Sequence, residues 1–179
     1  MTAVRATRSS PNVRLPLRRT ARQAWLAVHL WSAGAWLGLD LALGAVVLTG
    51  LTTDRDATRA TCFQVLEVLA VWPLPLAGLV CLLSGVLLGL GTSYGLLRYW
   101  WVTVKLAINL VLTTLVLVLL SPNMRHVAGQ GRELAAGRDV SVDVSSLVMP
   151  PSVTVVALTV AVWLSVWKPW GRIRRTPAG

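Results

Sequence analysis

The chain has 179 residues, of which 55% are hydrophobic and 13% are charged, whereas soluble domains carry roughly 25% charged residues. A soluble fold of this length could not cover so much apolar surface, so the composition excludes an ordinary soluble domain and indicates a lipid bilayer. The net charge of +10 does not indicate a nucleic-acid partner, and we predict none, because the basic residues lie in tails and short loops beside long apolar runs.

Residues 1–23 form a polar arm with six arginines and no acidic residue. We expect this arm to be disordered and cytoplasmic, because like charges repel and little apolar surface can be buried. A cleaved signal peptide is the alternative. The apolar stretch that follows is longer than a signal core and has no clear small-residue cleavage site, which favours a retained helix.

Apolar runs predict four transmembrane helices, each near the roughly 20 residues that a bilayer crossing requires. The first is expected over residues 24–48 and contains two ionisable residues, His29 and Asp40. The others are expected over residues 66–91, 99–120 and 150–167.

Prolines and polar residues predict the breaks between these helices. Pro73 and Pro75 predict a break or kink near the start of the second helix, and Pro150 with Pro151 suits the first turn of the fourth. Residues 121–148 are predicted as the longest loop, with a short surface helix over GRELAAGR.

The basic residues also predict the orientation. Four spans place both termini on one side, where the arm contributes six basic residues and the C-terminal tail four, against two and three in the opposite loops. The richer side is cytoplasmic. We therefore expect an all-α integral membrane four-helix bundle, N-in and C-in, with a transmembrane domain at 24–168 and a basic tail at 169–179. Arginine far outnumbers lysine, which favours a bacterial source and a bacterial cytoplasmic membrane.

Ionisable groups inside a membrane are costly and are therefore candidates for function. His29 and Lys105 enter from the same side at similar depth, and Lys105 shares one face of its helix with Arg98 and Asn109. This pattern predicts a shared site in the cytoplasmic half. Two simpler interpretations stand beside it: Lys105 reaches the headgroups, and His29 only donates a hydrogen bond between helices.

Asp40 lies about 16 Å along the first helix from His29, in the outer half of the membrane. A carboxylate there costs several kcal/mol, so it must be protonated, paired or facing water. Glu67, at the outer start of the second helix, is the expected neighbour, and the two together suggest a proton or ion path.

Two further groups of residues are candidates, one for helix contacts and one for metal binding. Gly34 with Gly38, and Gly85 with Gly89, have the spacing that allows close helix approach, within the chain or to a homo-oligomer or membrane-protein partner. Sulfur and imidazole groups at the outer edge suit Cu(I): Cys62, Met124, His126 and Met149. They are scattered in the sequence, which favours the simpler interpretation of loop residues near solvent.

Two segments carry a resemblance to known families. The first helix reads VHLWSAGAWLGLDLALG, and the third reads LRYWWVTVKLAINLVL with Lys105 in an aliphatic setting. Over residues 24–120 the chain resembles an uncharacterised bacterial four-helix family related to copper-resistance protein D and to HemJ-type protoporphyrinogen oxidases. The resemblance implies that His29 and Lys105 occupy positions tied to haem binding and activity in the HemJ type.

One departure from that resemblance limits the haem hypothesis. The second histidine, His126, would lie about 31 Å from Lys105 along a continuous third helix. A bis-histidine haem within one chain is therefore excluded, which leaves a single histidine ligand, a second ligand of another type, or no haem.

Three functions remain open from the sequence. The first is binding of haem b, another porphyrin or a quinone, with His29 as ligand or proton carrier and Lys105 and Arg98 as partners of anionic groups. The others are copper or ion transport through Asp40, and a non-catalytic accessory subunit. No hydrolase or nucleotide-binding motif occurs, so the sequence assigns no reaction.

Overall fold

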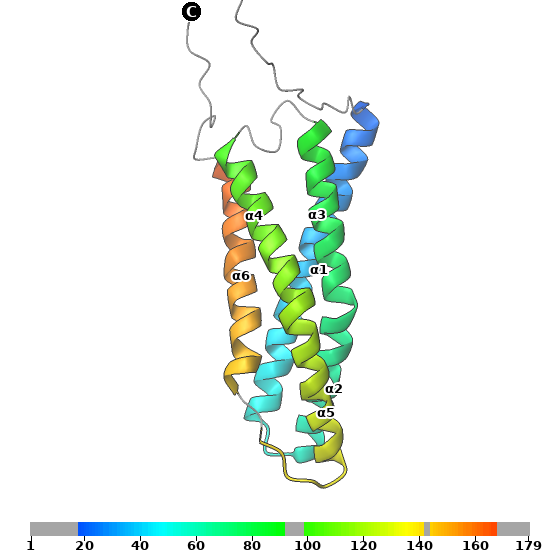
Figure 1. Ribbon diagram of the computed structural model, residues 1–179, viewed down its shortest axis with the longest axis vertical. Coiled ribbons are helices and arrows are strands. Elements are labelled where there is room, and N and C mark those ends of the chain that lie inside the picture. Colours follow the sequence, from blue (N-terminus) through cyan, green and yellow to red (C-terminus); the bar gives the residue numbers. More distant parts are fainter. Residues whose placement is uncertain (1–17, 92–98, 142–143, 168–179) are drawn as a thin grey trace, which may run out of the picture.

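The computed structural model describes residues 18–91, 99–141 and 144–167, with the backbone alone for 144–146. Within these ranges the chain forms an elongated bundle whose helices run along its long axis (Figure 1). The helices are α1 (Arg19–Thr52), α2 (Asp56–Val71), α3 (Pro73–Gly91), α4 (Trp100–Leu115), α5 (Ser121–Ala135) and α6 (Val144–Trp167), with a π-helical segment, η1 (Val116–Leu120), between α4 and α5.

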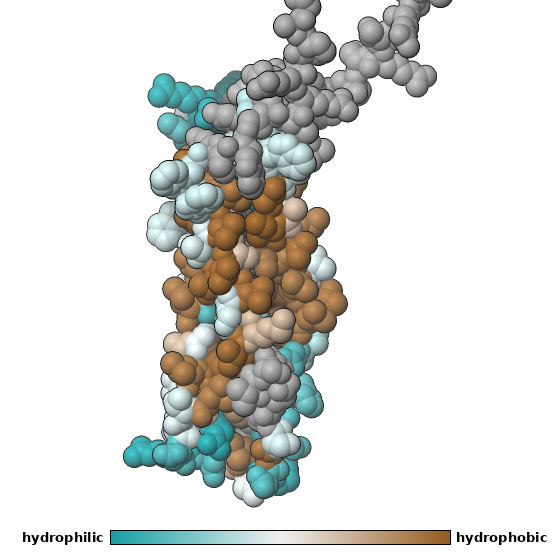
Figure 2. Space-filling view, turned by 90° about the vertical axis from the view of Figure 1, so that its left-hand side faces the viewer, coloured by the Kyte–Doolittle hydropathy of each residue, from teal (hydrophilic) through white to brown (hydrophobic). Residues whose placement is uncertain are grey.

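Four helical stretches in the described residues are long and apolar enough to cross a membrane. They are Arg19–Thr52, Asp56–Gly91, Trp100–Ala135 and Leu147–Trp167. Figure 2 shows a broad hydrophobic band between more hydrophilic ends on one face of the bundle. The prediction of an all-α chain with four membrane-length helices is thus confirmed.

The first two spans are longer than predicted, because α1 extends from Arg19 to Thr52 and α2 begins at Asp56. The 34 residues of α1 extend about 51 Å, well beyond the ~30 Å hydrocarbon core of a bilayer. Hydrophobicity marks only the part of a helix that crosses the apolar layer, whereas backbone hydrogen bonding continues into polar residues at each end.

The second span is interrupted at Trp72, between α2 and α3, as Pro73 and Pro75 predicted. Proline lacks a backbone N–H and cannot continue the hydrogen-bond ladder. At this break the carbonyl of Ala70 accepts a hydrogen bond at 3.0 Å from the hydroxyl of Ser121, at the start of α5. The break in one span is therefore connected directly to the π-helical irregularity in the next.

The segment after Leu120 corrects the predicted loop at 121–148, because α5 continues the third span to Ala135. A Cβ at Gly131 would lie 2.9 Å from the carbonyl oxygen of Ala60, so α5 and α2 approach very closely. The continuous apolar run ends at Leu120, but the helical period continues in the buried residues Met124, Val127, Ala128 and Gly131.

The last helix also begins earlier than predicted. α6 starts at Val144, so Pro150 and Pro151 lie inside it and not in its first turn. Leu147 is fully buried in the hydrophobic core. The turn of α6 that precedes the prolines is therefore packed against the bundle. The hydroxyl of Thr154 donates to the carbonyl of Pro150 at 2.9 Å.

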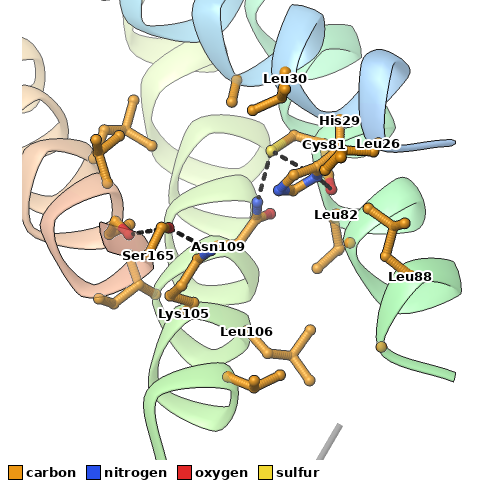
Figure 3. A pocket seen from close by; sticks show the side chains of 18 of the residues that line it. Leu26, His29, Leu30, Cys81, Leu82, Leu88, Lys105, Leu106, Asn109 and Ser165 are labelled. Atoms are coloured by element: carbon orange, nitrogen blue, oxygen red, sulfur yellow. Dashed lines mark hydrogen bonds between the residues drawn. The ribbon is translucent and has the colours of Figure 1, made fainter. Parts of the chain in front are cut away.

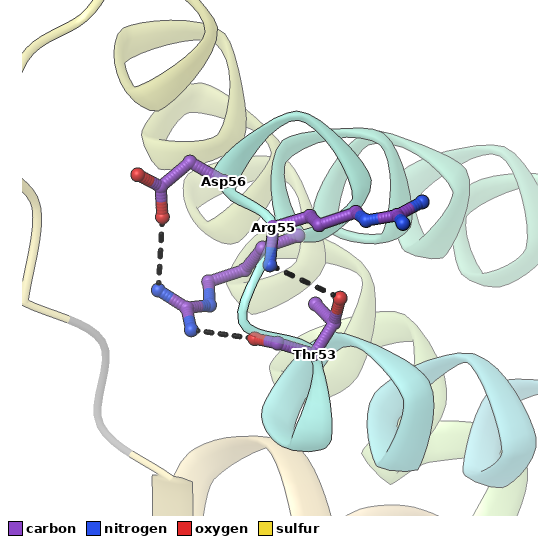
Figure 4. Close-up of polar contacts among 4 residues, drawn as sticks. Thr53, Arg55 and Asp56 are labelled. Carbon is purple, nitrogen blue, oxygen red and sulfur yellow. Dashed lines mark hydrogen bonds and ion pairs between the residues drawn. The ribbon is translucent and has the colours of Figure 1, made fainter.

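A short polar turn connects α1 to α2 (Figure 4). The guanidinium of Arg59 donates to the carbonyl of Thr53 at 2.8 Å and contacts the carboxylate of Asp56 at 3.3 Å. The backbone N–H of Arg55 donates to the Thr53 hydroxyl at 3.3 Å. These contacts close the turn without apolar residues.

The antiparallel register of α1 against α2 and α3 follows from three contacts: His29 with Ser84, Trp36 with Gly78, and Gly50 with Phe63. Thr113 of α4 also lies at Gly78, since a Cβ there would be 3.2 Å from both the Thr113 hydroxyl and the Trp36 ring. Trp36, Gly78 and Thr113 therefore mark one level in the bundle, from which other depths can be counted.

Candidate functional site

A cavity of about 640 Å³ lies between α1, α3, α4 and α6, near the end of the bundle where α1 begins. Toward this end α4 and α6 diverge from α1 and α3 (Figure 1). Most of the wall is apolar, and the polar or ionisable side chains that line it are Arg22, His29, Cys81, Lys105, Asn109 and Ser165. This composition suits an amphipathic ligand with a large apolar body.

The hydrogen bonds of His29 define its tautomer (Figure 3). Its Nδ1 lies 3.0 Å from the carbonyl of Cys81 and 3.1 Å from the hydroxyl of Ser84, and that hydroxyl is 2.6 Å from the Val80 carbonyl, to which it donates. A carbonyl can only accept, so we assign the proton of His29 to Nδ1. The unprotonated Nε2 has no hydrogen-bond partner among the described residues and is left as an electron-pair donor.

A chain of polar contacts extends from His29 across to α4. The amide nitrogen of Asn109 donates to the sulfur of Cys81 at 3.2 Å, and that sulfur lies 3.8 Å from His29 Nδ1. The hydroxyl of Thr113 donates in turn to the Asn109 amide oxygen at 3.3 Å. These bonds hold α1, α3 and α4 together at the floor of the cavity and limit the rotation of the imidazole.

Lys105 occupies the opposite wall. Its ammonium group donates to the hydroxyl of Ser165 on α6 at 2.7 Å and lies 5.8 Å from the centre of the Trp101 ring. A lysine ammonium has three N–H donors, so this bond leaves donors for an anionic or carbonyl group. Lys105 is thus half-buried and bonded across to α6.

The structure brings together three of the four residues predicted to share a site: His29, Lys105 and Asn109. Trp36 and Thr113 lie at one level. From that level, His29 on α1 and Lys105 on α4 each lie roughly 10–12 Å nearer the end of the bundle where α1 begins. The fourth predicted residue, Arg98, lies outside the described residues.

Sequence reasoning missed three members of this site. Cys81 and Ser84 are three residues apart on α3, which places both on the face toward His29, so their spacing was a usable signal. The sequence offered no such signal for Ser165, because a serine in an apolar helix usually donates to its own backbone. The hydroxyl of Ser165 does so as well, to the carbonyl of Ala161.

Asp40 lies outside the cavity and is 1% exposed. Among the described residues, neither of its carboxyl oxygens has a hydrogen-bond partner, and the indole N–H of Trp36, one turn away, also lacks one. The expected neighbour Glu67 instead binds Arg132 on α5 at 3.1 Å. Glu67 therefore makes no hydrogen bond to Asp40, because the helical α5 brings an arginine to it, and a proton or ion path through the two stays a prediction.

The predicted copper ligands do not converge. Met124 is buried against α2 and His126 is exposed, because residues two apart on a helix point about 200° apart. Met149 is 68% exposed, and Cys62 contacts the Gly50 end of α1. No group of three or more histidine, cysteine or acidic side chains could hold a metal ion in the described part of the chain.

The two glycine pairs behave differently. A Cβ at Gly85 would lie 3.2 Å from the ring of His29, so this glycine makes room for the imidazole. At Gly34 and Gly38 a Cβ would meet nothing within 4 Å, and both are exposed. The expected close approach at Gly34 and Gly38 therefore does not occur among the described helices, and any role in a partner contact stays a prediction.

No family model, curated protein or solved structure matches this chain. The resemblance to the families named above stays a prediction.

Proposed function

We propose that the cavity binds haem b or a related porphyrin, with His29 Nε2 as the ligand of the central metal. The hydrogen bond from His29 Nδ1 to the Cys81 carbonyl carries this proposal. Histidines that ligate a metal commonly donate their other ring N–H to a backbone carbonyl, which fixes the tautomer and raises the basicity of the ligating nitrogen. Bound iron would supply redox or ligand-binding chemistry.

The remaining side chains of the cavity fit such a molecule. The apolar wall accommodates the macrocycle, and Lys105 and Arg22 provide cations for its carboxylates. The space at Gly85 allows the imidazole to lie close to α3. His29 is the only histidine on the cavity, since His126 is exposed on α5. The proposal therefore includes one histidine ligand per chain.

The test is the absorption spectrum of detergent-purified protein from cells supplied with a haem precursor, in the oxidised and reduced states. We expect a Soret band in the wild type, loss of that band in His29→Ala, and an unchanged band in the control His126→Ala. A wild-type spectrum without a Soret band, or a band that survives in His29→Ala, would contradict the proposal.

A quinone is the second candidate, favoured by the way the cavity opens to the side. Leu30, Val162 and Val166 line the cavity and are also 62%, 56% and 72% exposed. A ligand dissolved in the bilayer could enter between α1 and α6 and meet the donors of Lys105. Organic extraction followed by chromatography should then recover a quinone from the wild type and less from Lys105→Met, and recovery of none would remove this candidate.

We also propose that the chain lies in a bacterial cytoplasmic membrane with both termini in the cytoplasm, based on the excess of basic residues in the terminal segments. Asp54→Cys, in the turn between α1 and α2 and in a chain whose Cys62 and Cys81 are replaced by serine, should react with an impermeant thiol reagent on intact cells. A cysteine at Arg18 should react only after permeabilisation. The reverse pattern would show the opposite orientation.

A further inference from the structure

The carboxyl of Asp40 is buried and has no partner among the described residues, at a second place in the bundle about 16 Å along α1 from His29. Leaving both oxygens of a buried carboxyl without a donor is expensive, because the desolvation of an ionised carboxylate is uncompensated. The side chain of Asp40 is therefore incomplete without a bound species that the protein itself does not provide.

Two other spans are irregular at the depth of Asp40. Asp40 is one turn beyond Trp36, so the antiparallel register places it level with Leu74, in the first turn of α3 and two residues from the break at Trp72. α4 runs parallel to α1, and its Thr113 is level with Trp36. Four residues after Thr113, at the level of Asp40, is Leu117 in the π-helical segment η1. Asp40 therefore lies at the depth where the second and third spans both depart from regular α-helix, a feature that recurs at functional sites.

These irregularities release oxygen atoms. Pro73 and Pro75 have no N–H, so the carbonyls of Leu69 and Val71 lose the donors that a regular helix would give them. A carboxylate and carbonyl groups are all acceptors and cannot bond to one another. A cation between them would satisfy both, as unwound backbone does at the cation sites of membrane transporters.

No charged side chain in the described part of the bundle is placed to neutralise Asp40. Lys105 on α4 lies about 18 Å away along the axis. Glu67 on α2 is paired with Arg132 of α5, and the titratable group of α3 is Cys81, which belongs to the cavity. The described residues of η1 and α6 contain no ionisable side chain.

We propose that Asp40 is the centre of a monovalent-cation site, which takes H⁺ or Na⁺ at the level of the two helix irregularities. This site is separate from the cavity and does not depend on what the cavity binds. Its ligands would be the carboxyl of Asp40 and backbone carbonyl oxygens, which are the hard oxygen donors that such cations prefer.

Infrared difference spectra of wild type minus Asp40→Asn, with the full chain in liposomes, test this directly. In sodium-free buffer we expect the carbonyl stretch of a protonated Asp40, and its complete loss as the pH is raised. At a fixed pH, sodium chloride is compared with choline chloride. Displacement of the band by sodium alone assigns Na⁺, whereas titration with pH and no effect of sodium assigns H⁺.

Two controls make the result specific. Glu67→Gln should leave the band and its titration unchanged, and Asp40→Glu should retain a titrating band at a shifted frequency even if Asp40→Asn does not fold. A band of constant intensity at every pH and in both salts would overturn the proposal, since Asp40 would then be a permanently neutral structural group. Absence of both the band and any salt-dependent carboxylate change would overturn it as well.

Discussion

Replacing Gly131 by alanine should destabilise the bundle, whereas the same replacement at Gly129 should not. A Cβ at Gly131 would lie 2.9 Å from both the Ala60 carbonyl oxygen and the Phe63 Cβ, neither of which can move without α2. Ordinary contact requires about 3.5–4.0 Å, so α2 and α5 would have to separate by roughly 0.6–1 Å. Overpacking of this kind typically costs about 1–3 kcal/mol.

Gly129 is a matched control because it lies in the same helix, and a Cβ there would meet only the Arg132 guanidinium, at 3.9 Å. Both replacements gain about 1 kcal/mol of helix propensity, so the difference between the variants isolates the packing cost. Thermal unfolding in one detergent should place Gly131→Ala about 1–3 kcal/mol below Gly129→Ala. Equal stabilities would refute the close contact of α5 with α2.

Three further outcomes are expected. Ser121→Ala should lower stability by about 1 kcal/mol in the same unfolding assay, because the carbonyl of Ala70 loses its donor; no change would mean that another group takes its place. A double-mutant cycle on Glu67 and Arg132 should give a coupling below about 1 kcal/mol that falls with added salt, as the pair is partly exposed; a larger, salt-independent value would place it in a buried setting. Gly34→Leu should unfold like the wild type, since its Cβ position is open, and a change in elution volume on size-exclusion chromatography would reveal a partner contact there.

Part of the candidate site could be predicted from the sequence, because the position of a residue in a helix determines how far along the bundle it lies. His29 and Lys105 lie five and six residues after the predicted starts of their spans, at positions 24 and 99, and helical rise converts those distances into depth. In the structure α1 begins earlier, at Arg19, so the apolar run and not the helix start gives the depth. Their hydrogen-bond partners could not be read, because Cys81 and Ser165 reach them only through the packing of separate helices.

The third span shows where hydrophobicity alone misleads. Leu120 ends the apolar run, and the polar residues that follow were expected to form a loop. The helix continues because one face of α5, including Met124 and Gly131, is buried against α2. The helical spacing of those small and apolar residues was present in the sequence. It predicts a buried helix face only when another helix is known to pack there.

The sequence by itself determined the helical class, the four membrane-length spans and the break at Pro73, because these depend on local hydrophobicity and on the missing N–H of proline. Only the tertiary structure decided which polar groups meet. It paired Glu67 with Arg132, joined His29 to Cys81 and left Asp40 without a partner among the described residues. Contacts between helices depend on their relative register and rotation, and these are set by side-chain packing over the whole bundle.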